Sequence, residues 1–136
     1  MEKKYRIAIF ASGSGTNAEK VIEYFHNHPM VEVTILLSNN PDAKALTRAE
    51  KLGIPSTAFS KDIFTDEKAF LALLLAHRVT HIVLGGFLWM IPQFLIPSFR
   101  DRIINIHPAL LPRFGGKGMY GLKVHQAVKD AGETET

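Results

Sequence analysis

A short apolar run that stops at a glycine-rich loop most constrains how this chain can fold. Residues Tyr5–Ala11 have the length and composition of a buried parallel strand, and the loop Ser12–Asn17 follows directly. Apolar residues then recur at helical spacing as far as His28-Pro29. The loop thus precedes a helix, whose first backbone N–H groups and dipole attract anions. The order strand, loop, helix is that of an α/β unit that can hold a phosphate.

The rest of the chain repeats this alternation. Strands are predicted at residues 31–37, 56–59, 80–84 and 102–107, and helices at 43–52, 63–76, 93–99 and 124–131. The apolar side of the 63–76 helix is predicted to carry Phe64, Phe70, Leu71, Leu74 and Leu75. Alternating strands and helices predict an α/β fold with a Rossmann-like, open, mainly parallel sheet flanked by helices.

Composition bounds the class of protein. With 136 residues, 46% hydrophobic and 21% charged, the chain is expected to form one globular domain over residues 1–136. The net charge of +3 is modest and its basic residues are scattered, which suits acidic small molecules better than nucleic acid. No apolar run approaches the roughly 18 residues of a membrane span, and there is no cysteine. We therefore expect a cytoplasmic protein with no membrane partner.

The histidines do not indicate a metal site. His26 and His28 are two residues apart, which does not place them on one helix face. His77 and His81 straddle a predicted helix end, and neither pair has a carboxylate at metal-ligand spacing. No metal is predicted.

Several ligands could fit the glycine-rich loop. Gly13, Gly15 and Ala18 match the pattern G-x-G-x-x-A, but a dinucleotide site needs an acidic residue after the next strand, and that strand ends in Ser38-Asn39-Asn40. A P-loop is excluded because no Gly-Lys-Ser/Thr follows. A phosphate site and a purely structural turn remain.

A second polar pair ends the strand predicted at 102–107. Asn105 and His107 share one face of an extended segment, while Ile104 and Ile106 share the other. Pro108 ends the strand because it cannot donate to a sheet. In open α/β sheets, ligands bind at the carboxyl ends of strands. A catalytic role and a simple turn-forming role both fit this placement.

The run Asn105-Ile106-His107-Pro108-Ala109-Leu110-Leu111-Pro112 resembles the signature of the folate-dependent formyltransferases. The loop Ser12–Asn17 resembles the S-G-x-G-[ST]-N loop of the glycinamide ribonucleotide branch of that family. The resemblance implies catalytic Asn105 and His107, and substrate contacts at Ile106 and Pro108. It implies a phosphate held by Gly13, Ser14, Gly15, Thr16 and Asn17. On this basis Gly15→Val is expected to weaken nucleotide binding and to leave the fold mostly intact.

A cluster of apolar side chains follows the strand at 80–84. This cluster consists of Phe87, Leu88, Trp89, Met90 and Ile91. Such a cluster is often part of a core. The resemblance instead implies the apolar wall of a folate pocket, although many relatives have Arg where Trp89 stands.

The implied reaction moves a formyl group from 10-formyltetrahydrofolate to the amine of 5'-phosphoribosylglycinamide. Its expected partners are these two small molecules and, in a homodimer, a second copy of the chain. The alternatives are a tRNA formyltransferase, a deformylase or a non-catalytic nucleotide-binding module. A deformylase is expected to carry an extra amino-terminal domain, for which this sequence has no room.

Relatives continue into a D-x-G-x-I-[IL] motif that this sequence, which ends at Thr136, does not contain. The sequence is therefore expected to represent the amino-terminal part of the enzyme, with weak or no activity by itself. Apolar surface near Ile103, Ile104 and Ile106 is expected to be uncovered and to favour self-association. Two further expectations are a cis Leu111–Pro112 bond and a mobile glycine-rich substrate loop over residues 114–121.

Overall fold

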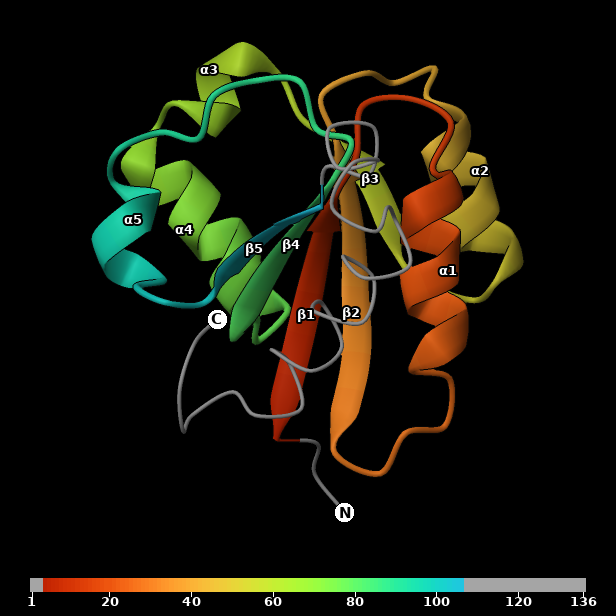
Figure 1. Cartoon of the computed structure of the whole chain (residues 1–136). Coiled ribbons are helices and arrows are strands. Elements are labelled where there is room, and N and C mark those ends of the chain that lie inside the picture. The colour runs from red at the N-terminus through yellow and green to blue at the C-terminus, as the bar shows by residue number, and fades with distance from the viewer. Residues whose placement is uncertain (1–3, 107–136) are drawn as a thin grey trace, which may run out of the picture.

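The computed structural model describes residues 4–106, which form a parallel sheet with helices on both faces (Figure 1). Predictions for His107, Pro108, the Leu111–Pro112 bond, the loop 114–121 and the helix 124–131 lie outside the described residues. The elements in chain order are β1 (Tyr5–Phe10), α1 (Thr16–Tyr24), β2 (Val31–Ser38), α2 (Lys44–Lys51), β3 (Ser56–Ala58), α3 (Lys61–Phe64), α4 (Glu67–Ala76), β4 (His81–Gly85), α5 (Leu95–Ser98) and β5 (Ile103–Ile106).

The sheet has the strand order β3-β2-β1-β4-β5, and every pair of neighbouring strands is parallel. Helices α1 and α2 cover one face, whereas α3, α4 and α5 cover the other (Figure 1). The predicted open parallel α/β fold is confirmed. Because the chain moves outward from β1 in both directions, the order of the strands reverses between β1 and β4.

Aromatic packing anchors the layer that contains α3 and α4. The ring of Phe10, at the end of β1, is fully buried. Its centroid lies 5.3 to 6.4 Å from those of four other rings, all in edge-on contact. These rings belong to Phe59, Phe64, Phe70 and Phe87. Edge-on pairs of this kind add roughly 0.5–1.5 kcal/mol each beyond the area they bury.

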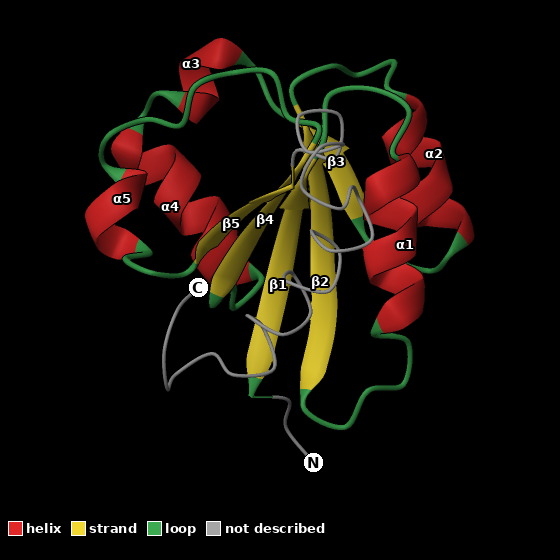
Figure 2. Cartoon of the chain, in the orientation of Figure 1, coloured by secondary structure: helices red, strands yellow, loops and turns green. Residues whose placement is uncertain are grey.

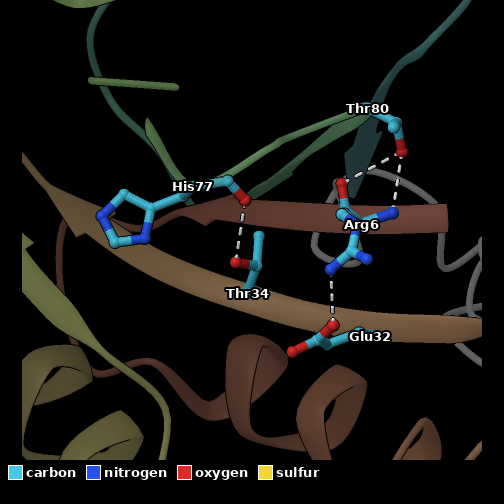
Figure 3. Close-up of polar contacts among 5 residues, drawn as sticks. All are labelled: Arg6, Glu32, Thr34, His77 and Thr80. Carbon is cyan, nitrogen blue, oxygen red and sulfur yellow. Dashed lines mark hydrogen bonds and ion pairs between the residues drawn. The ribbon is translucent and has the colours of Figure 1, made fainter. Parts of the chain in front are cut away.

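One extra residue interrupts β2. The pairing register between β1 and β2 skips Thr34, so that β2 carries a bulge there. The Thr34 hydroxyl donates a hydrogen bond to the carbonyl of His77, at the end of α4, over 3.0 Å (Figure 3). The core side chains of β2 are divided between the layers, with Val31, Val33 and Leu36 against α1 and α2, and Ile35 and Leu37 against the other helices.

Polar contacts tie the amino-terminal ends of the strands together (Figure 3). Arg6 Nη1 lies 2.9 Å from Glu32 Oε1 across β1 and β2. The backbone N–H of Arg6 donates to Thr80 Oγ1 over 2.8 Å, just before β4. These bonds satisfy polar groups that the packed layers partly remove from water.

His81 is a buried part of the fold. Its ring packs edge-on against Tyr5, with centroids 5.5 Å apart, and its Nδ1 lies 2.7 Å from Thr80 Oγ1. Burial first, and then the nearby positive charge of Arg102, lower the pKa of His81 to about 4. The imidazole is therefore neutral at pH 7.

The prediction of one helix over residues 63–76 is wrong, since α3 and α4 replace it. Asp66 begins α4 as its N-cap, because Asp66 Oδ1 accepts the Ala69 N–H over 3.1 Å. Ser60 caps α3 in the same way. Leu75, predicted on the buried side, is 76% exposed. The helix predicted at 93–99 is also shorter, because α5 covers only Leu95–Ser98.

Strand β5 forms one edge of the described sheet. Ile106 is buried and Ile104 is half-buried, both against the layer of α1 and α2. Ile103 is half-buried against the opposite layer. The expectation of uncovered apolar surface is therefore wrong at Ile106. The expectation that Ile104 and Ile106 share one face of β5 is confirmed.

Candidate functional site

Three neighbouring strands bring the predicted site segments together. The glycine-rich loop leaves β1, the segment 87–91 follows β4, and Asn105 lies near the end of β5. Phe10 pairs with Leu84, and Leu84 pairs with Asn105, so the ends of these strands are level. Loops gather at this end of the sheet in Figure 2. The site thus lies beside the reversal of strand order between β1 and β4, where open α/β sheets bind ligands.

Gly15 allows the loop to enter α1. It is the N-cap and has a left-handed backbone with φ of 80°. A Cβ added here would lie 2.5 Å from Ala45 Cα, so both the conformation and the close approach of α2 require glycine. The Glu19 N–H donates to the Gly15 carbonyl over 2.8 Å, and no side chain caps α1. The N–H groups of residues 16–18 precede this bond and are oriented for an anion.

Helix α2 fixes the loop from behind. The Ala45 N–H donates to the Gly13 carbonyl over 3.0 Å, and Arg48 Nε donates to the Ser14 carbonyl over 2.6 Å. Because a trans peptide places its carbonyl and the following N–H on opposite sides, the N–H groups of Ser14 and Gly15 point away from α2. The loop therefore presents backbone donors on its free side.

Arg48 also balances a negative charge close to the loop. Its Nη1 forms an ion pair with Glu19 Oε1, in the first turn of α1. An unpaired carboxylate there would repel a bound phosphate. Sequence reasoning missed Arg48, since no motif marks it. The small residues Ala45 and Ala49, four apart and buried in α2, were the available sign of a close approach.

Ser12 connects the loop to the segments that follow β2 and β4. Its buried hydroxyl donates to Asn39 Oδ1 over 2.6 Å and accepts the Leu88 N–H over 2.8 Å. Its own N–H donates to the Gly86 carbonyl over 3.2 Å. Asn39 follows β2, where a dinucleotide site would carry an acidic residue. Here the amide instead orients Ser12, a contact that sequence reasoning did not find.

The segment predicted to form a folate wall alternates between core and surface. Leu88 and Met90 are 82% and 90% exposed, while Phe87, Trp89 and Ile91 are half-buried against the aromatic layer. The core interpretation therefore fits Phe87, Trp89 and Ile91, which pack against the aromatic layer. The wall interpretation fits Leu88 and Met90, which are exposed.

Trp89 occupies a definite place in that layer. Its ring centroid lies 5.6 Å from that of Phe64 and 6.0 Å from that of Phe59. Lys61 Nζ lies 4.7 Å from the centroid of the Trp89 ring, within the range of a cation–π contact. Trp89 therefore holds the segment 87–91 against the aromatic layer.

Of the predicted catalytic pair Asn105 and His107, Asn105 lies within the residues that the structure describes. It is exposed, and it lies on the face of β5 opposite Ile104 and Ile106. The side chain of Ile106 is buried, so a substrate contact there would involve its backbone. His107 and Pro108 lie outside the described residues.

A groove of about 520 Å³ opens at the other end of the sheet. Its lining includes Arg6, Glu32, Thr34 and His77, whose polar atoms form the contacts of Figure 3. The groove is remote from the glycine-rich loop. Within residues 4–106, no group of three or more metal-ligating side chains could hold a metal ion, and no helix could cross a membrane.

The sheet order, the braced loop and the position of Asn105 define an α/β protein with a candidate anion site at the reversal of strand order. The chain belongs to the formyl transferase family, whose model matches residues 5–136.

Several similar proteins carry the name phosphoribosylglycinamide formyltransferase. Phosphoribosylglycinamide formyltransferase of Bacillus subtilis is 35% identical over 95% of this chain, which covers 69% of that protein. The chloroplastic enzyme of the same name from Arabidopsis thaliana is 37% identical over 96% of the chain. The crystal structure of phosphoribosylglycinamide formyltransferase from Brucella melitensis has a TM-score of 0.70 and 33% identity, over 96% of this chain and 68% of that one. The chain spans 47% of the Arabidopsis protein and 43% of that from Vigna unguiculata, about half the length of these plant relatives.

Proposed function

We propose that this chain is part of an enzyme that transfers a formyl group from 10-formyltetrahydrofolate to the amine of 5'-phosphoribosylglycinamide. Family membership and the names of the relatives support the reaction. The observation that carries the choice of substrate is the loop Gly13–Asn17, which combines a left-handed glycine cap, backbone donors on its free side and a neutralised carboxylate. These features suit the phosphate of a ribonucleotide.

In this proposal the phosphate binds to Gly13, Ser14, Gly15, Thr16 and Asn17. The folate binds beyond β4, where Leu88 and Met90 offer exposed apolar side chains to its flat ring system. Phe87, Trp89 and Ile91 hold that segment against the core. Because the loop and the segment leave neighbouring strands, the amine of one substrate and the formyl group of the other can meet near β5.

Asn105 and His107 are assigned the chemical step. The amine nitrogen attacks the formyl carbon and forms a tetrahedral intermediate with a negatively charged oxygen. The Asn105 amide and a protonated His107 donate hydrogen bonds to that oxygen. His107 then helps to move a proton from the amine nitrogen to the folate nitrogen, whose bond to the formyl carbon breaks. Ile106 and Pro108 flank the pair and contact the substrate.

Isothermal titration of this chain with the ribonucleotide and with a folate analogue tests the proposal. Binding of both ligands is expected. Binding of the nucleotide alone would favour a non-catalytic nucleotide-binding module, and binding of neither would refute both functions. Asn105→Ala should leave binding of inorganic phosphate unchanged, because Asn105 lies two strands away from the loop that binds the phosphate.

A cytoplasmic location and self-association complete the proposal. Leu75 and Ile96 expose 76% and 54% of their surface, and such apolar side chains favour contact between copies of the chain. Sedimentation velocity at two protein concentrations is expected to reveal a dimer, and a monomer at both concentrations would contradict this part.

A further inference from the structure

Ser12 is hydrogen-bonded to both ends of the segment Gly86–Leu88. Its N–H donates to the Gly86 carbonyl over 3.2 Å, and its Oγ accepts the Leu88 N–H over 2.8 Å. These bonds continue the contact between β1 and β4 beyond the ends of the two strands. They therefore join the start of the loop assigned to phosphate to the start of the segment assigned to folate.

The orientation of the Ser12 hydroxyl is set by Asn39. A hydroxyl has one proton to donate, and Ser12 donates it to Asn39 Oδ1 over 2.6 Å. A lone pair of the oxygen is then directed at the Leu88 N–H. Because Ser12 is only 7% exposed, water competes little for either bond.

The segment held by Ser12 is able to respond to a change in the loop. Gly86 has a left-handed backbone with φ of 76°, and a Cβ there would meet nothing within 4 Å. Gly86 is thus exposed where the segment begins. Leu88 has an 82% exposed side chain, and its N–H is held by the buried Ser12 hydroxyl. A displacement of Ser12 would consequently move the exposed part of the wall.

We propose that Ser12 is a positioning residue that couples the two substrate subsites. An anion on the loop holds Ser12 in place, and Ser12 then holds the Leu88 backbone in the position that suits the folate ring system. This inference rests on the proposed function. Because coupling between two binding sites is reciprocal, the folate would strengthen binding of the nucleotide by the same factor.

Nuclear magnetic resonance of the backbone amides, with inorganic phosphate as the probe, tests the connection directly. Saturating phosphate is expected to shift the Leu88 amide together with those of residues 15–17. In Ser12→Ala the loop amides should still shift, but the Leu88 amide should not. Ser98→Ala is the matched control, since the Ser98 hydroxyl is bonded within its own helix to the Phe94 carbonyl. An unmoved Leu88 amide in the unaltered chain, or one that still moves in Ser12→Ala, would overturn the inference.

The affinity of a folate analogue with and without the ribonucleotide measures the coupling. The ribonucleotide is expected to tighten folate binding about fivefold or more in the unaltered chain. The ratio should fall to about one in Ser12→Ala and return in Ser12→Thr, which keeps the hydroxyl. If both ligands bind the unaltered chain independently, the inference fails and the proposed function stands. If the folate analogue does not bind at all, the proposed function fails and the inference fails with it.

Discussion

Replacement of Gly15 by alanine should destabilise the fold through two separable effects. The backbone of Gly15 is left-handed, which costs a residue with a Cβ roughly 1–2 kcal/mol. In addition, the new Cβ would lie 2.5 Å from Ala45 Cα and 2.7 Å from Ala45 Cβ. Overpacking of this kind costs about 1–3 kcal/mol. The free energy of unfolding should therefore fall by roughly 2–5 kcal/mol.

Two other glycines separate these effects. Gly53 has nearly the same backbone, with φ of 81°, but a Cβ there would meet nothing within 4 Å. Gly53→Ala should therefore cost only the conformational part, roughly 1–2 kcal/mol. Gly13 lies in the same loop as Gly15, has no left-handed φ and is equally open. Gly13→Ala should change the free energy of unfolding by less than about 1 kcal/mol.

Urea denaturation of the three variants and the unaltered chain measures the differences. The order of stability should be Gly13→Ala, then Gly53→Ala, then Gly15→Ala. Equal losses for Gly15→Ala and Gly53→Ala would refute the close contact with α2. The contact also corrects the expectation from the sequence that Gly15→Val leaves the fold mostly intact, because a larger side chain would force α2 away from the loop.

Three further changes follow from the contacts described. Arg48→Ala should weaken binding of inorganic phosphate severalfold in isothermal titration, because the Ser14 carbonyl loses its donor and the Glu19 carboxylate loses its ion-pair partner. Lys51→Ala, on the same helix, should leave phosphate binding unchanged. Since the pKa of His81 is lowered to about 4, the unfolded chain binds more protons than the folded one between that pH and about 6.5. Urea denaturation should therefore show stability falling as the pH drops through this range, and His81→Leu should reduce the slope. Asp66→Ala removes the N-cap of α4 and should lower the melting temperature by an amount that corresponds to about 1 kcal/mol, while Asp62→Ala should leave it nearly unchanged.

Local patterns predicted the positions of the strands and of the loop in the chain, because each depends on neighbouring residues. The apolar run before Ser12 and the glycines after it place β1 and the loop correctly. Apolar spacing does not reveal the break between α3 and α4, because the spacing continues across the break from Phe64 to Phe70. The Asp66 side chain caps a new helix at this break.

The contacts that position the site depend on tertiary structure. Ser12 meets Leu88, which is 76 residues away in the chain, and Arg48 of α2 meets Ser14 of the loop, which is 34 residues away. No periodicity encodes such pairs. The sequence could predict where the loop lies, but the residues that hold the loop in place come together only when β1, β2, β4 and α2 are assembled.

The bulge at Thr34 has a consequence for insertions and deletions in this fold. When Thr34 is left out, the remaining core residues of β2 alternate regularly between the two layers. Deleting Thr34 would therefore keep every core side chain in its layer and would remove only the hydrogen bond to His77. Deleting Val33 or Ile35 instead, while keeping a regular strand, would place the Thr34 side chain in the core position of the deleted residue. A relative with a β2 one residue shorter should accordingly align with its gap at Thr34, inside a strand rather than in a loop.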